Sequence, residues 1–287
     1  MPVSPEPEEL EIRVPGLCLA AKAWGRAEAP LVLALHGWLD NASSFDTLAP
    51  LLPELRVVAL DLPGHGLSEH RPLGQAYHFV DWLPVVFDAA DALHAQSFSL
   101  MGHSMGAGIA ALAAGALPNR VERLVMLEGL GPSVVADHLL PEKVNQHLLQ
   151  RKRLSQRKRK AYPNVDAAIQ ALLLALPELS RASAERLVRR GTVAVDGGVT
   201  WRADPRLRLV SMHRFSEAQV LAFLRRIEAP SLVVRADRGF VFDREQMRQR
   251  CAQVKGLRVH ELNGGHHVHL DDAQLVSPAV RELFGLD

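Results

Sequence analysis

The chain has 287 residues, a length that suits one large domain or a core with an insertion and can enclose a site. Lys and Arg number 33 against 32 Asp and Glu, so the net charge of +1 argues against nucleic-acid or anionic-membrane binding. The two cysteines, Cys18 and Cys251, lie far apart, which argues against a disulfide framework or a zinc site and suits a reducing compartment. The first residues lack the basic and apolar pattern of a signal peptide, and no apolar run could span a bilayer. We therefore expect a cytoplasmic protein.

Strands and helices alternate along the first part of the chain. Two apolar stretches around Pro15-Gly16 predict a β-hairpin, and later short apolar runs predict buried strands. The predicted strands are residues 10–14, 17–23, 31–35, 56–60, 98–101 and 121–127. Helical spacing is found over residues 45–52, 79–94 and 105–117. This alternation predicts an α/β fold with a mostly parallel sheet and helices on both faces.

The alternation stops over residues 132–215, where the sequence is rich in Leu, Arg, Gln and Ala and has a break at Gly197-Gly198. This composition predicts an inserted helical cap, or lid, between two core segments, residues 1–131 and 216–287. A basic run at residues 151–160 could bind phosphate, but on a cap helix such a run is usually a solvated face, and the sequence gives it no role. The later predicted elements are strands 231–235 and 257–262 and helices 244–254 and 278–284.

The pentapeptide Gly102-His103-Ser104-Met105-Gly106 lies between an apolar strand and a helix of small residues. A serine hydroxyl is a poor nucleophile unless a base can remove its proton and nearby amides can receive the developing oxyanion. The glycines permit a sharp turn through the serine, and the following helix directs its positive N-terminal end to that point. This context predicts a nucleophile elbow with Ser104 as the nucleophile.

A general base is expected in the loop after the last predicted strand. There, Gly264 and Gly265 precede His266, and glycines let a loop approach a site closely. We predict that His266 is the base, with the adjacent His267 as its competitor. For His269, packing or a loop hydrogen bond is the better interpretation.

The segment His267-Val-His269-Leu-Asp271-Asp272 nearly matches the H-x-H-x-D-H pattern of metallo-β-lactamase-like hydrolases, which bind metal ions. The last position is aspartate, however, and no second histidine cluster follows downstream. We therefore expect no metal ion and no other cofactor.

Four motifs in order make the chain resemble the α/β-hydrolase superfamily, especially its serine-hydrolase-like branch. They are the loops His36-Gly37-Trp38-Leu39-Asp40-Asn41 and Asp61-Leu-Pro-Gly-His-Gly-Leu-Ser68, the elbow, and Gly265-His266. The resemblance implies an oxyanion hole made by the backbone amides of Trp38 and Met105. It leaves His36 and Asp61 to brace loops, and His103 to pack beside the site.

The triad acid departs from the family's common pattern. The family usually places it at the end of a Gly-x-x-Asp sequence after strand seven, but Ala236-Asp237-Arg238-Gly239 has glycine there. Related dehalogenases can supply an acid from the end of strand six, where this chain has Glu128. We favour Glu128 over Asp237, with Asp243 third, because a glutamate that ends a buried strand needs a partner.

The expected function is serine-dependent cleavage of a small-molecule carboxylic ester or related acyl bond through an acyl-enzyme. Lactonase, C–C bond hydrolase and aminopeptidase activities stay open, because the cap selects the substrate. A non-catalytic binding module is the rival from another class. Aspartate-nucleophile dehalogenases and epoxide hydrolases fit less well, since position 104 is serine. The oligomeric state is not readable from the sequence.

Overall fold

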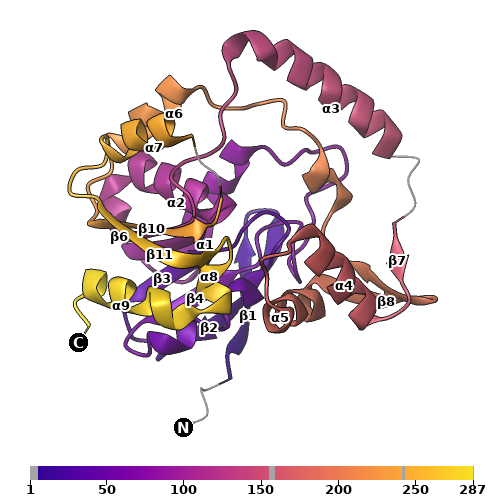
Figure 1. The fold of residues 1–287 in the computed structure, drawn as a ribbon, viewed down its shortest axis with the longest axis horizontal. Coiled ribbons are helices and arrows are strands. Elements are labelled where there is room, and N and C mark those ends of the chain that lie inside the picture. The colour runs from indigo at the N-terminus through magenta and orange to yellow at the C-terminus, as the bar shows by residue number, and fades with distance from the viewer. Residues whose placement is uncertain (1–5, 155–158, 241–242, 287) are drawn as a thin grey trace.

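The computed structural model describes residues 6–154, 159–240 and 243–286, and an eight-stranded sheet forms the centre of this part (Figure 1). In spatial order the strands are β1 (Glu8–Val14), β2 (Leu17–Trp24), β4 (Arg56–Leu60), β3 (Leu31–Leu35), β5 (Phe98–His103), β6 (Val121–Leu127), β10 (Ser231–Arg238) and β11 (Arg258–Gly265). The strands β1 and β2 form the expected hairpin, and β2 pairs antiparallel with β4. From β4 to β11 every pairing is parallel. The predicted fold class is confirmed.

Helices cover both faces of the sheet because its central strands are apolar on both sides. In β3, Leu33 and Leu35 pack into the core of one face, whereas Val32 and Ala34 pack into the core of the other. The first face carries α1 (Trp82–Ala92), α2 (Met105–Ala116), α6 (Glu217–Leu224) and α7 (Arg244–Cys251). The second face carries α8 (Val268–Asp271) and α9 (Ala273–Phe284).

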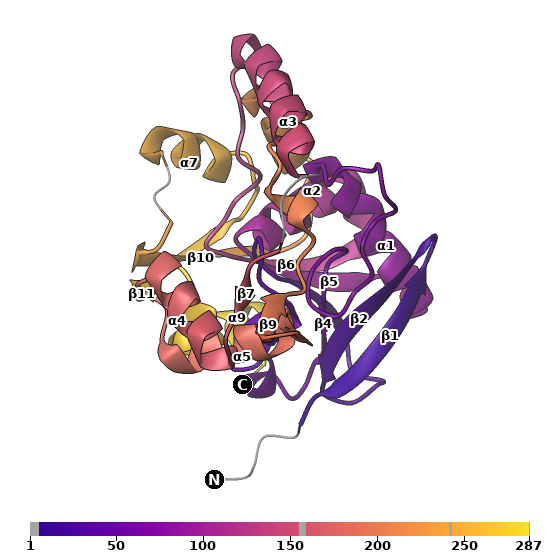
Figure 2. The same ribbon diagram turned by 90° about the vertical axis from the view of Figure 1, so that its right-hand side faces the viewer.

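The segment between β6 and β10, here called the inserted segment, contains helices and a small sheet. Its helices are α3 (Leu140–Leu154), α4 (Val165–Ala175) and α5 (Arg181–Gly191). The small antiparallel sheet has the order β7 (Ala161–Tyr162), β9 (Gly198–Trp201), β8 (Thr192–Val195). Helix α3 projects from the end of the molecule, apart from α4 and α5 (Figures 1 and 2). The break expected at Gly197-Gly198 is the turn of the β8–β9 hairpin, where both glycines have positive φ.

Two predicted helices differ from the structure. The helix expected at residues 45–52 is replaced by two short 3-10 turns, Ala42–Phe45 and Ala49–Leu51. Pro50 lacks the amide hydrogen that a continuous helix would need there. The last helix begins at Ala273, so that Pro278 lies inside it and not at its start. None of the helices in the described residues is long and apolar enough to cross a membrane.

Candidate active site

Ser104 forms a sharp turn between β5 and α2. Its backbone has φ 52° and ψ −111°, a conformation that is unusual for a residue other than glycine. The turn is tight enough that a Cβ at Gly102 would collide with the Gly106 carbonyl. A Cβ at Gly106 would collide with the Leu35 carbonyl at the end of β3. The two glycines are therefore required by close backbone contacts, as the elbow interpretation expects.

The candidate residues lie at the carboxyl ends of parallel strands. Ser104 follows β5, Glu128 follows β6, and His266 follows β11. Because β5, β6, β10 and β11 are successive neighbours in the sheet, these ends share one edge. Ligand sites in open α/β sheets form at this edge.

Glu128 is buried, with 2% of its surface exposed, and its carboxylate has three hydrogen-bond donors. The Ala236 amide donates to Oε1 at 2.5 Å, and the Phe240 amide donates to Oε2 at 2.7 Å. The ring nitrogen Nδ1 of His266 lies 3.2 Å from Oε2. A buried carboxylate needs such partners, and here one backbone amide comes from the last residues of β10 and one from the chain after it.

The other two candidate acids bind elsewhere. Asp237 has a half-exposed side chain and accepts a hydrogen bond from the Gly264 amide at 2.8 Å, which lowers the pKa of its carboxyl. Asp243 caps α7 by accepting from the Gln246 amide at 2.7 Å. The structure therefore brings Glu128, and neither aspartate, into hydrogen-bond contact with His266.

The contact with Glu128 determines how His266 can act. A carboxylate can only accept, so Nδ1 of His266 carries the proton and donates it to Glu128. In the neutral ring the other nitrogen, Nε2, then has a free lone pair. His266 thus has the tautomer that a general base requires.

The loop after β3 lies against the first turn of α2, through the contact between Gly106 and the carbonyls of Leu35 and His36. This contact brings the chain at Trp38 close to the start of the helix at Met105. The Trp38 indole is half-exposed, and its Nε1 donates to the Leu207 carbonyl at 3.0 Å. The Trp38 side chain therefore ties this loop to the inserted segment.

A cavity of about 520 Å³ opens beside Ser104. Its lining includes Ser104, Met105, Trp38 and Glu128, together with aromatic side chains. Those aromatic residues are Tyr77, Phe79, Trp82, Phe215 and Phe240. His266 is not among the lining residues, but its ring contacts that of Phe240 at a centroid distance of 5.8 Å. The cavity is large enough for a small apolar acyl group.

Asp40, His103 and His267 form a buried polar group next to His266, and the sequence did not predict that they meet. His103 Nε2 lies 2.9 Å from the His266 carbonyl, which can only accept, so Nε2 carries the proton. Burial lowers the pKa of His103 to about 3, which keeps its ring neutral. Asp40 Oδ2 lies 3.5 Å from His103 Nδ1 and 3.2 Å from His267 Nε2. Through the bonds to the His266 carbonyl and the His267 ring, this group fixes the position of the loop that carries His266.

Asp40 and His267 stabilise each other's charge. Burial raises the pKa of Asp40, but His267 and His103 outweigh it and hold the value well below the ordinary range. Burial lowers the pKa of His267, but Asp40 outweighs it and the net shift is upward. Asp40, His103 and His267 are the kind of residues that bind metals, with ligand atoms within 4.8 Å of one another. We interpret Asp40 and His267 as a hydrogen-bonded ion pair, in which His267 Nε2 donates to Asp40 Oδ2 at 3.2 Å. The neutral His103 turns its unprotonated Nδ1 toward Asp40 and so is not part of this pair.

His269 lies fully buried on the far side of this group. Its Nε2 is 2.9 Å from Ser44 Oγ, and burial holds its pKa well below the ordinary value. Its backbone carbonyl accepts from Thr47 Oγ1 at 3.0 Å. The structure thus places His269 in the core, in keeping with the packing interpretation.

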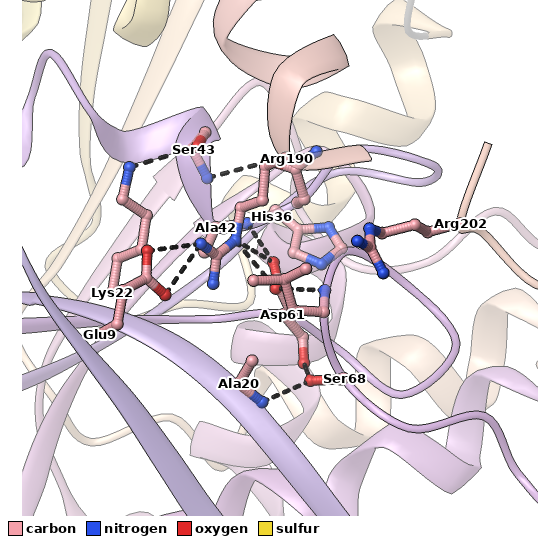
Figure 3. A network of polar contacts seen from close by, with 12 residues as sticks. Glu9, Ala20, Lys22, His36, Ala42, Ser43, Asp61, Ser68, Arg190 and Arg202 are labelled. Carbon is pink, nitrogen blue, oxygen red and sulfur yellow. Dashed lines mark hydrogen bonds and ion pairs between the residues drawn. The ribbon is translucent and has the colours of Figure 1, made fainter. Parts of the chain in front are cut away.

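The predicted bracing residues join the core to the inserted segment (Figure 3). His36 Nε2 accepts from the Leu62 amide at 3.0 Å. The fully buried Asp61 accepts from the Ala42 amide at 2.7 Å and from Arg190 Nε at 2.9 Å. Arg190 comes from α5 and also pairs with Glu9 of β1. This network anchors α5 to the loops that surround the site.

The family model described as the alpha/beta hydrolase fold matches residues 30–273. The chain belongs to the α/β-hydrolase family. This α/β hydrolase is 35% identical to a serine hydrolase-like protein from Dictyostelium discoideum over 292 residues, covering 96% of this chain and 81% of the relative. The resemblance expected from the four motifs is therefore confirmed.

Two solved structures show how far the likeness extends. The hypothetical protein PA1622 from Pseudomonas aeruginosa PAO1 is 41% identical to this α/β hydrolase, with a TM-score of 0.92 over 97% of this chain and 99% of that one. A thioesterase domain from the curacin biosynthetic pathway is 29% identical, with a TM-score of 0.83 over 96% of this chain and 99% of that one. The similarity thus spans both the core and the inserted segment.

Proposed function

We propose that this α/β hydrolase is a serine-dependent acyl hydrolase that cleaves a carboxylic ester or thioester through an acyl-enzyme. The proposal rests chiefly on the contact between His266 Nδ1 and the buried carboxylate of Glu128, on the sheet edge that carries Ser104. A histidine that donates to a buried, hydrogen-bonded acid at this edge is the arrangement that general-base catalysis requires. The likeness to a thioesterase domain supports including thioesters.

In the proposed mechanism, Nε2 of His266 removes the proton of Ser104 as Oγ attacks the acyl carbonyl. The amides of Trp38 and Met105 stabilise the tetrahedral oxyanion, and the N-terminal end of α2 adds its partial positive charge. His266 then gives its proton to the leaving group. Water, deprotonated by His266, hydrolyses the acyl-enzyme and returns Ser104 to its starting state.

In this proposal Glu128 and residues 132–215 support the reaction without reacting themselves. Glu128 holds His266 in the productive tautomer and stabilises its charged form, and Asp237 takes no part. Residues 132–215 act as the cap. Leu207 binds the Trp38 indole and Phe215 lines the cavity, so this segment helps to select the acyl group.

The test is hydrolysis of a series of p-nitrophenyl esters and matched thioesters of increasing acyl length. We expect turnover by the wild-type protein, with an optimum at short or medium acyl chains that the cavity of about 520 Å³ can hold. The Ser104→Ala variant should be inactive. Equal rates for the two proteins, with both folded, would contradict the proposal and favour a non-catalytic binding module.

A further inference from the structure

A second, larger cavity lies next to the first and is lined by positive charge. Its volume is about 1150 Å³, and we call it the basic groove. The cationic side chains that line it are Arg71, Arg153, Arg159, Lys160, Arg206 and Arg208. Asp204 is the one acidic residue among the described residues that line it. The whole chain carries a net charge of only +1, so this is a local concentration of cations.

Arg206, one of these cations, is fully engaged by contacts within the protein. Arg206 pairs with Asp204 at 2.6 Å, which neutralises that acid, and donates to the carbonyls of Pro72 and Gln75. The positive charge that remains therefore belongs to the other five cations. Arg206 itself holds the loop at residues 71–75 against the inserted segment.

Four of the five remaining cations are not matched by protein acids. Within the described part of the chain, no carboxylate forms an ion pair with Arg153, Arg159, Lys160 or Arg208. Three of them come from the basic run at residues 151–160 that the sequence left without a role; residues 155–158 of that run lie outside the described residues. Several guanidinium groups around one groove match the charge and hydrogen-bonding capacity of phosphate better than those of a single carboxylate.

The two cavities meet at Arg208 and Leu209, which line both. The Arg208 guanidinium lies 5.7 Å from the ring centroid of Trp38, so it is held at this junction. An apolar group could occupy the aromatic cavity beside Ser104 while an anionic extension of the same molecule passes Arg208. This arrangement separates an acyl group from a large polyanionic group.

We propose that the basic groove binds the phosphate-bearing leaving group of an acyl thioester, of the type formed by coenzyme A. This inference rests on the proposed function and specifies its substrate class. Ser104 would take the acyl group from sulfur, forming the serine ester, and the proton of Ser104 would pass through His266 to the released thiolate. Water would then release the carboxylic acid and restore the serine hydroxyl. The groove's volume, twice that of the acyl cavity, suits a nucleotide carrier.

The experiment compares three thioesters of one acyl group, carried on coenzyme A, on 4′-phosphopantetheine and on pantetheine. We expect kcat/KM to rise with the number of phosphates, by about ten-fold or more from pantetheine to coenzyme A, and to fall at high salt. The double variant Arg153→Gln/Arg159→Gln should lose most of this preference, mainly through a higher KM, and keep the wild-type rate on pantetheine. Highest activity on phosphopantetheine would support the same phosphate recognition with a carrier protein as the source.

The control is Arg26→Gln/Arg226→Gln, which removes the same charge from two exposed residues that line neither cavity. It should behave as wild type on all three thioesters. Equal kcat/KM for the coenzyme A and pantetheine thioesters, or equal losses in both double variants, would overturn the inference. A protein that cleaves none of the thioesters and no p-nitrophenyl ester would instead refute the proposed function.

Discussion

The carboxylate of Glu128 occupies the space that a side chain at Gly239 would need. A Cβ built on Gly239 would collide with Oε2 of Glu128. In the related family, the acid usually extends from this position after the seventh strand, whereas here it reaches the same place from the end of β6. The glycine and the glutamate therefore form one adaptation, in which the end of β10 and the chain after it contribute backbone amides to the acid and no side chain.

Substituting Glu128 and Asp237 in turn shows which carboxylate acts as the triad acid. The Glu128→Gln variant should lower kcat by about 10³–10⁴-fold, because His266 loses the group that fixes its tautomer and stabilises its charge. The Asp237→Asn variant should keep near wild-type kcat, since Asp237 contacts the Gly264 amide. Steady-state kinetics on one activated ester, with circular dichroism to check folding, measures both. A large loss in Asp237→Asn alone would reverse the assignment.

Moving the carboxylate from residue 128 to residue 239, the family's usual position, tests whether the glutamate and the glycine compensate for each other. Glu128 has φ 56°, which glycine tolerates well, so Glu128→Gly should fold but lose turnover. Adding Gly239→Asp places a carboxylate where that of Glu128 was. We expect the double variant to recover at least about ten-fold in kcat over Glu128→Gly, the effect of restoring a partner to the histidine. In the wild-type background, Gly239→Asp alone should lower activity, because the two side chains would overlap; full activity there would argue against the proposed adaptation.

The anchor of α5 can be tested through stability. Arg190→Met leaves the fully buried Asp61 without its cationic partner, and losing one member of a buried pair costs about 3–5 kcal/mol. The neighbouring Arg189→Met removes an exposed pair with Glu185, which should cost less than about 0.5 kcal/mol. Urea denaturation compares the two variants. Similar stabilities would show that Arg190 is not an anchor.

The buried histidines predict acid instability. Burial lowers the pKa of His65 and of His103 to about 3, whereas the unfolded chain binds protons near pH 6.5. Below pH 6.5 the unfolded state therefore binds more protons, and stability should fall by about 1.4 kcal/mol per pH unit for each histidine. His267, with its raised pKa, adds stability that is fully present below pH 6.5 and is lost as the pH rises through its folded-state pKa, so it does not change the slope below pH 6.5. Denaturation between pH 7 and pH 4.5 measures the slope, which should be shallower in His65→Gln; a flat profile would contradict the burial.

The fold could be predicted from the sequence because its signals are local and repeated. The apolar strands, the elbow glycines and the hairpin around Pro15-Gly16 each determine their structure from neighbouring residues. The helix expected over residues 45–52 fails for a local reason, since Pro50 lacks the amide hydrogen that a continuous helix needs. The helical cap expected over residues 132–215 also contains the strands β7, β8 and β9. Strand β7 pairs with β9 from more than thirty residues earlier in the chain, and a pairing over that separation is not readable from the local sequence.

The site was predictable only as far as its motifs extend. Ser104 and His266 lie in recognisable loops, and Glu128 could be suggested because an acid ended an apolar strand. The collision between Gly239 and Glu128 depends on a contact across β10, which the sequence does not reveal. The same holds for Asp40, in the loop after β3, and His103, at the end of β5, whose side chains lie 3.5 Å apart.

Labelling with a fluorophosphonate tests the central claim most directly, because this reagent modifies only an activated serine. Peptide mass mapping of the purified protein should find one adduct per chain, on Ser104, and none in Ser104→Ala. Labelling should be strongly slowed in His266→Ala but nearly unchanged in His267→Gln, since His267 pairs with Asp40. No adduct on the folded wild-type protein, or an adduct on another serine, would contradict the account.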